Sequence, residues 1–87
     1  ESFEIVFQPS VAKDLKRFPA TVVGRVMRRI EDLATDPWPA QRVKLSGAER
    51  LYRIRVGDYR VVYEVDAEAR QVTIHYVRHR RDVYRAI

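Results

Sequence analysis

The chain has 87 residues, a formal net charge of +5 and no cysteine, so a disulfide framework and a thiolate metal site are excluded. No apolar run approaches the roughly 20 residues of a membrane span, and no targeting leader precedes the first elements, so we expect one small cytoplasmic domain over residues 1–87 without membrane association. Residues 44–87 hold 10 basic and 6 acidic side chains, nine of the basic ones arginine, which indicates a polyanion such as nucleic acid, or an acidic protein partner.

The N-terminal half predicts one strand and two helices. Apolar and β-branched residues over 2–8 predict a first strand. Pro9 and Ser10 are suited to opening a helix, which Pro19 ends. The apolar stripe that follows predicts a second helix from about Thr21 to Thr35, with Thr21 as its N-cap.

The second predicted helix has a basic outer face formed by Arg25, Arg28 and Arg29. These arginines could contact a polyanion, but a solvated face is the favoured interpretation, because amphipathic helices have charged outer faces. The segment from Asp36 to Pro39 stops the helix. Within this segment, Trp38 is expected to pack over an edge of the core.

The C-terminal half predicts three or four strands joined by polar turns. A short strand over 41–46 has Val43 and Leu45 facing inward. A hairpin over 51–65 turns at Gly57 and Asp58. A last strand over 72–77 has two alternating sets of side chains: Val72, Ile74 and Tyr76 against Thr73, His75 and Val77.

This order of elements predicts an α+β fold. Consecutive strands joined by short turns form an antiparallel meander, and two helices must cover its apolar face. We therefore expect two N-terminal helices packed on a four-stranded, mainly antiparallel sheet whose other face is open.

The hairpin gathers three arginines on that open face. A two-residue turn places Arg55 opposite Arg60, and opposed residues share a face. The residues expected on it are Arg53, Arg55, Arg60, Val62 and Glu64. Because like charges directly opposite destabilise a sheet and guanidinium groups bind phosphate bidentately, we expect a phosphate-binding face. The alternative is a solvated face whose arginines are neutralised by Glu64 and nearby acids.

The remaining side chains limit the chemistry. His75 and His79 join no cysteine or carboxylate cluster, which disfavours a metal site, and His75 is expected to be structural. The three glycines are isolated, which disfavours a phosphate loop. An enzyme built on this chain would work without metal or cofactor. RNA cleavage by the substrate's own 2′-OH suits it, because the protein need only orient the phosphate, stabilise charge and move two protons.

The hairpin sequence Tyr52 to Val65, followed by the sequence Val77 to Arg85, resembles the RelE/ParE toxin superfamily, and its RelE branch in particular. The resemblance covers essentially the whole chain. It implies the toxin of a type II toxin–antitoxin pair, a metal-independent endoribonuclease that cuts mRNA in the ribosomal A site. It also implies a RelB-like antitoxin as partner, with operator DNA bound only through the toxin–antitoxin complex.

The resemblance further implies a set of site residues. Its catalytic positions fall on Arg53, Arg55, Arg60, Arg80 and Tyr84. Arg60 and Arg80 would stabilise the phosphate, Arg80 would also assist the leaving group, and Tyr84 would orient or stack the nucleotide. The expected additional RNA contacts are Lys44, Arg78 and Arg81.

One departure from the family affects the proton-transfer group. The best-studied RelE members carry lysines at the positions of Arg53 and Arg55, one of them the proposed base, and arginine is a poor base. Glu64 or His79 could serve as the acid or base instead, or a guanidinium could act by electrostatics with proton transfer to water.

Two other functions remain compatible with the sequence. A ParE-like toxin would bind and inhibit DNA gyrase without cleaving RNA, and it would have no need of Arg80 and Tyr84 together. A basic RNA-binding module or an inactive relative is the third interpretation.

Overall fold

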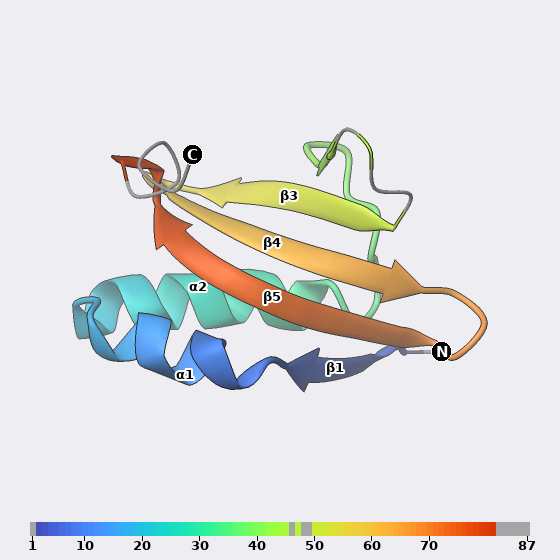
Figure 1. Cartoon of the computed structure of the whole chain (residues 1–87), viewed down its shortest axis with the longest axis horizontal. Coiled ribbons are helices and arrows are strands. Elements are labelled where there is room, and N and C mark those ends of the chain that lie inside the picture. The colour runs from blue at the N-terminus through green and yellow to red at the C-terminus, as the bar shows by residue number, and fades with distance from the viewer. Residues whose placement is uncertain (1, 46, 48–49, 82–87) are drawn as a thin grey trace.

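The computed structural model describes residues 2–45, 47 and 50–81 (Figure 1). The elements in chain order are β1 (Glu4–Phe7), α1 (Pro9–Lys16), α2 (Ala20–Asp32), β2 (Val43–Lys44), β3 (Leu51–Val56), β4 (Tyr59–Asp66) and β5 (Gln71–His79). The α+β class and the two N-terminal helices are thereby confirmed. None of the helices among these residues is long and apolar enough to cross a membrane.

The prediction of a four-stranded, mainly antiparallel sheet was wrong in two details. The sheet has five strands in the order β1-β5-β4-β3-β2, and β1 pairs with β5 in parallel. The other pairs are antiparallel. The reason is that β1 is separated from β5 by both helices and the hairpin, so no tight turn forces an antiparallel pairing.

The second helix begins earlier than predicted. Its N-cap is Pro19, which has an extended backbone, so Thr21 lies inside the helix and the prediction of Thr21 as N-cap was wrong. The carbonyl oxygen of Pro19 accepts hydrogen bonds from the amides of Val22 and Val23, each at 3.0 Å. A proline suits this boundary, because its restricted backbone interrupts the preceding helix without removing a bond from the next one.

Along β5, the neighbouring element changes from β1 to α1 (Figure 1). Where β1 ends, Ser10 Oγ donates to the carbonyl oxygen of His75 at 3.3 Å. One helical turn later, Asp14 Oδ2 accepts from the amide of Val77 at 3.1 Å. Side chains of α1 therefore satisfy backbone groups of β5 that a longer β1 would have paired.

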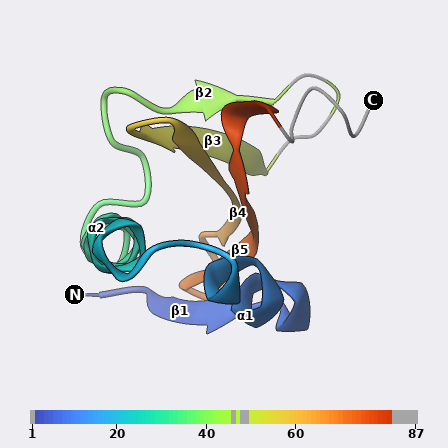
Figure 2. The same ribbon diagram turned by 90° about the vertical axis from the view of Figure 1, so that its left-hand side faces the viewer.

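The core lies between the helices and one face of the sheet (Figure 2). Its buried members are Val11, Val26, Ile30, Leu33, Ile54, Val56, Val61, Tyr63, Val65, Val72, Ile74 and Val77. Tyr63 Oη donates to the carbonyl oxygen of Pro37 at 2.8 Å, and burial of this hydroxyl raises the pKa of Tyr63. Trp38 packs edge-to-face on Phe3 at 5.8 Å between ring centroids, as the expected edge position requires.

The hairpin has the predicted register. Val56 pairs with Tyr59, Arg55 with Arg60 and Ile54 with Val61. Gly57 adopts φ +60°, a conformation that suits glycine in a two-residue hairpin turn.

A bulge in β5 overturns the predicted alternation of that strand. The register shifts between Val62 and Tyr63, so that Val62 pairs with Tyr76 while Tyr63 pairs with Ile74. One residue of β5 is therefore extra, and the two faces exchange beyond it. Val77 is fully buried in the core, whereas Tyr76 is only half-buried and lies outside the core cluster.

The inward orientation predicted for Val43 was also wrong. In β2, Val43 pairs with Arg53 and is exposed, while Lys44 pairs with Tyr52. Because opposed residues share a face, Val43 lies beside Arg53 and Lys44 lies on the side of the helices. With only two residues at a sheet edge, alternation in the sequence is too short to determine the phase.

Candidate anion-binding site

The face of the sheet that points away from the core carries the candidate site. We call it the arginine face. Alternation on β3 and β4, and the bulge in β5, place on it the side chains that matter for the site: Arg53, Arg55, Arg60, Val62, Glu64, His75, Tyr76 and Arg78. No ion pair joins its four arginines to a carboxylate within residues 2–45, 47 and 50–81.

Three of these arginines form a row across the sheet. Arg60 on β4 is paired with Arg55 on β3 and with Arg78 on β5. Side chains paired directly across strands lie about 4.5–5.5 Å apart at Cβ. The row therefore concentrates three permanent positive charges at one end of the face, an arrangement that favours a bound anion.

Arg60 is the central member of the row and is nearly inaccessible. Only 6% of the residue is exposed, and its Nε has no hydrogen-bond partner among the described residues. A buried charged group without a partner is costly. An anion bound beside the guanidinium would offset part of this cost, so the burial of Arg60 favours a ligand at the row.

Arg78 reaches the row because of the bulge. Its guanidinium lies over the ring of Tyr76, with Cζ 4.7 Å from the ring centroid. The sequence predicts Arg78 only as an accessory RNA contact and does not predict its pairing with Arg60. The sequence did contain one sign of this change in alternation along β5, because Ile74 and Val77 are apolar residues three apart in a strand.

His79 lies on the opposite side of β5 from Arg78. Its ring packs edge-to-face on Tyr59 at 5.1 Å, and Tyr59 in turn packs on Phe18 of the α1–α2 region at 4.7 Å. Its Nδ1 accepts a hydrogen bond from the amide of Arg81 at 3.2 Å. The bulge therefore separates His79 from the arginine row.

Glu64 and His75 form a pair on the arginine face. His75 Nε2 lies 3.0 Å from Glu64 Oε1, and both side chains are about one-third exposed. The sequence favours a purely structural role for His75. The structure instead places it beside the carboxylate of Glu64, on the same face as the arginines.

The other residues predicted for the site lie at the margins of the arginine face or beyond it. Arg80 follows the end of β5, is exposed, and donates its amide to the carbonyl oxygen of Asp58 in the hairpin turn at 2.8 Å. Arg81 is exposed next to it. Lys44 faces the side of the helices, and Tyr84 lies outside the described residues.

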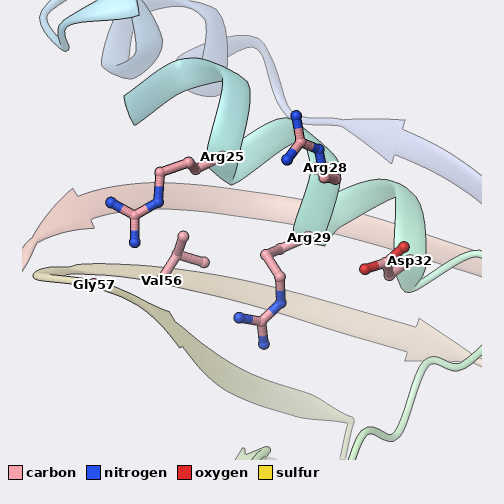
Figure 3. A pocket seen from close by; sticks show the side chains of 6 residues that line it. All are labelled: Arg25, Arg28, Arg29, Asp32, Val56 and Gly57. Atoms are coloured by element: carbon pink, nitrogen blue, oxygen red, sulfur yellow. The ribbon is translucent and has the colours of Figure 1, made fainter. Parts of the chain in front are cut away.

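A second basic site lies on the helix side of the same hairpin (Figure 3). A pocket of about 200 Å³ is lined by Arg25, Arg28, Arg29, Asp32, Val56 and Gly57. Arg25 and Arg29 lean toward the hairpin, whereas Arg28 points away from it. Arg29 Nη1 donates to the carbonyl oxygen of Arg55 at 3.5 Å, so the solvated interpretation of this helix face suits Arg28 better than its neighbours.

Comparison with known proteins places the chain among toxins. The sequence pattern of the family described as the ParE toxin of the type II toxin–antitoxin system parDE matches residues 5–84. A curated protein of Methanocaldococcus jannaschii named RelE1 is 31% identical over an alignment of 86 positions that covers 95% of this chain and 96% of that protein.

Two solved toxin–antitoxin complexes contain chains of the same fold. A chain of the RelBE2 complex from Mycobacterium tuberculosis superposes with a TM-score of 0.81 and 25% identity, covering 91% of this chain and 99% of that one. A chain of the RelB–RelE complex from Methanococcus jannaschii gives a TM-score of 0.79 and 28% identity, covering 94% and 98%.

Proposed function

The chain belongs to the RelE/ParE toxin superfamily of type II toxin–antitoxin systems, on its RelE-like branch, and from this premise we propose that it is an endoribonuclease that cleaves mRNA in the ribosomal A site. The single observation that carries the proposal is Arg60, buried and without an acceptor between Arg55 and Arg78. A phosphodiester supplies the acceptors and the negative charge that this position lacks.

The reaction we propose uses the substrate's own 2′-OH as nucleophile. Its oxygen attacks the adjacent phosphorus, and negative charge grows on the phosphoryl oxygens. Arginines fixed on a sheet stabilise that charge without reorganising, which is the largest contribution such a site can make. The bond to the 5′ oxygen of the next nucleotide then breaks, so the products are a cyclic 2′,3′-phosphate and a 5′-hydroxyl end.

The proposed roles follow the position of each residue. Arg55, Arg60 and Arg78 hold the phosphate from the row, and Arg53 adds a fourth guanidinium one step along β3. The family motif adds Arg80, which assists the leaving group, and Tyr84, which orients the nucleotide. Arg81 and Lys44 are accessory RNA contacts.

The proposed partners are those of the relatives. The two solved relatives named above are complexes of RelE-type toxins with RelB-type antitoxins. We infer that a RelB-like antitoxin binds this chain and covers its site, that the complex alone binds operator DNA, and that residues 1–87 act as one domain in the cytoplasm.

The second candidate is inhibition of DNA gyrase by binding alone. The family description favours it, because the matching pattern carries the ParE name. A binding surface for a protein, however, does not require a buried, unpaired guanidinium flanked by two others. We therefore rank gyrase inhibition below RNA cleavage.

The test is cleavage mapping in a translation extract. The purified chain is added to a translating message, and 5′ ends are located by primer extension. We expect discrete cuts in the A-site codon with the wild type, none with Arg60→Ala or Arg80→Ala, and unchanged cuts with Lys16→Ala, which removes an exposed charge from α1. An intact message, together with inhibited supercoiling by gyrase, would replace this proposal with the second candidate.

A further inference from the structure

The Glu64–His75 pair is the one acid–base pair on the arginine face within the described residues. His75 Nε2 and Glu64 Oε1 are 3.0 Å apart, and β4 and β5 hold the two side chains on adjacent strands. The sequence leaves the proton acceptor open between Glu64, His79 and water. In the structure, His79 instead packs against Tyr59, and Glu64 is hydrogen-bonded to His75.

The hydrogen bond determines which nitrogen of His75 is basic. A carboxylate only accepts hydrogen bonds, so in the neutral imidazole the proton is assigned to Nε2, which donates to Glu64 Oε1. Nδ1 then carries the lone pair. No group among the described residues bonds to Nδ1, so this nitrogen is available to a substrate. A carboxylate that fixes the tautomer of a histidine is the arrangement that serves acid–base catalysis in hydrolases.

We propose that His75 is the general base of this toxin and that Glu64 is its positioning residue. The inference deepens the proposed RNA cleavage and rests on it. Nδ1 of His75 takes the proton of the 2′-OH as the 2′ oxygen bonds to phosphorus. The bond from phosphorus to the 5′ oxygen breaks, and the leaving oxygen takes a proton from water. The protonated His75 then returns its proton to solvent.

The position of the pair agrees with this role. Residues two apart along a strand are about 6.6 Å apart and share a face. Glu64 lies two residues beyond Val62, and Val62 pairs with Arg53. Arg53 therefore lies about one such two-residue spacing from the pair. Arg60, two residues before Val62, lies one spacing further away. In the proposed complex the row holds the phosphate, Arg53 contacts it from the side of the pair, and the 2′-OH of the nucleotide is directed toward His75.

The proton acceptor cannot come from the arginines, because a guanidinium keeps its proton near neutral pH. The charged and titratable groups around His75 come from three elements. Glu64 faces it from β4, Tyr76 and Arg78 follow it on β5, and Lys13 and Asp14 lie on the adjacent turn of α1, whose Ser10 bonds to its carbonyl oxygen. Glu64 is the group that contacts the imidazole directly.

The chain supplies a matched control, because it has two histidines on opposite faces of one strand. His75→Gln keeps a donor for Glu64 but has no basic nitrogen, and His79→Gln changes the histidine that lies away from the arginine row. Single-turnover cleavage on programmed ribosomes is measured from pH 6 to 8.5 for both variants, for Glu64→Gln, and for His75→Ala with and without added imidazole. Ribosome binding and thermal unfolding are measured in parallel.

We expect His75→Gln to slow cleavage by about 100-fold or more, the usual contribution of a general base, with binding unchanged. The rise of the wild-type rate with pH should flatten in this variant and persist in His79→Gln. Imidazole should restore part of the activity of His75→Ala, which a structural role would not permit. Glu64→Gln should lower the rate less than His75→Gln and should still show a rise of the rate with pH, because the imidazole remains.

Two results would overturn the inference. Cleavage by His75→Gln within threefold of wild type, while Arg60→Ala is inactive, removes His75 from the mechanism and leaves the proposed function intact. A wild-type chain that makes no cuts removes both proposals together.

Discussion

Arg55 and Arg60 lie directly opposite each other across β3 and β4, and Arg60 is the buried member of the pair. A fold dictated by stability alone would not place two guanidinium groups there, since like charges opposed on a sheet cost free energy. The arrangement therefore supports the anion-binding role proposed for this face, because departures from local stability rules concentrate at functional sites.

Replacing Arg60 by leucine should therefore separate stability from activity. Removal of a buried charge without a partner should raise the free energy of unfolding by about 1 kcal/mol, while RNA cleavage is lost. Urea unfolding of the two proteins measures the first effect. Added phosphate should stabilise the wild type more than Arg60→Leu, and equal stabilisation of both would contradict an anion site at Arg60.

Two glycines, one in the hairpin turn and one in α2, provide a matched test of stability. Gly57 has φ +60°, and a Cβ there would lie 3.2 Å from Arg25 Nη2. Gly57→Ala should cost about 1–2 kcal/mol because of the left-handed backbone alone. Gly24 lies in α2 with open space around it, so Gly24→Ala should stabilise the protein by up to about 1 kcal/mol. Chemical unfolding of both variants should give changes of opposite sign.

Tyr63 predicts a dependence of stability on high pH. Burial raises its pKa in the folded chain, whereas the unfolded chain ionises near the ordinary value of about 10. The stability contributed by the neutral hydroxyl is complete below that value and is lost progressively as the pH rises above it. Tyr63→Phe should lose about 1–2 kcal/mol at neutral pH, because the buried hydrogen bond to Pro37 disappears, and should show a smaller decline above pH 10. Unfolding curves from pH 7 to 11 measure both effects.

The bulge in β5 is tested by two truncations. Val77 is fully buried and Tyr76 is not. Val77→Ala should lower the free energy of unfolding by about 2 kcal/mol, and Tyr76→Ala by less than about 1 kcal/mol, mainly through its contact with Arg78. The reverse order would mean that β5 keeps the regular alternation predicted from the sequence.

The sequence was informative where side-chain patterns are long and local. The register of the hairpin followed from alternation over more than ten residues around a two-residue turn, and the structure reproduces it. The family resemblance rested on that hairpin and the segment after it, and the comparisons confirm it. The opposition of Arg55 and Arg60 could therefore be predicted from the amino-acid sequence alone.

The remaining features depend on contacts between distant segments. The parallel pairing of β1 with β5 has no local signature. The bulge is imposed where His75 and Tyr76 are opposite one residue of β4, and it determines that Arg78 and not His79 joins the row. The phase of β2 rests on two residues, too few for a periodic pattern, so Val43 was assigned to the wrong face.

The hydrogen bonds that join Ser10 and Asp14 to the backbone of β5 also affect how the chain behaves at high concentration. A strand edge with free amides and carbonyls is a template for pairing with other molecules, and proteins that leave such edges open tend to aggregate. Here the outer edge of β5 is shared between β1 and two side chains of α1, and the opposite edge of the sheet is the two-residue strand β2. Removing the acceptor with Asp14→Ala would uncover a stretch of β5 and make the protein more prone to self-association, even where its fold survives.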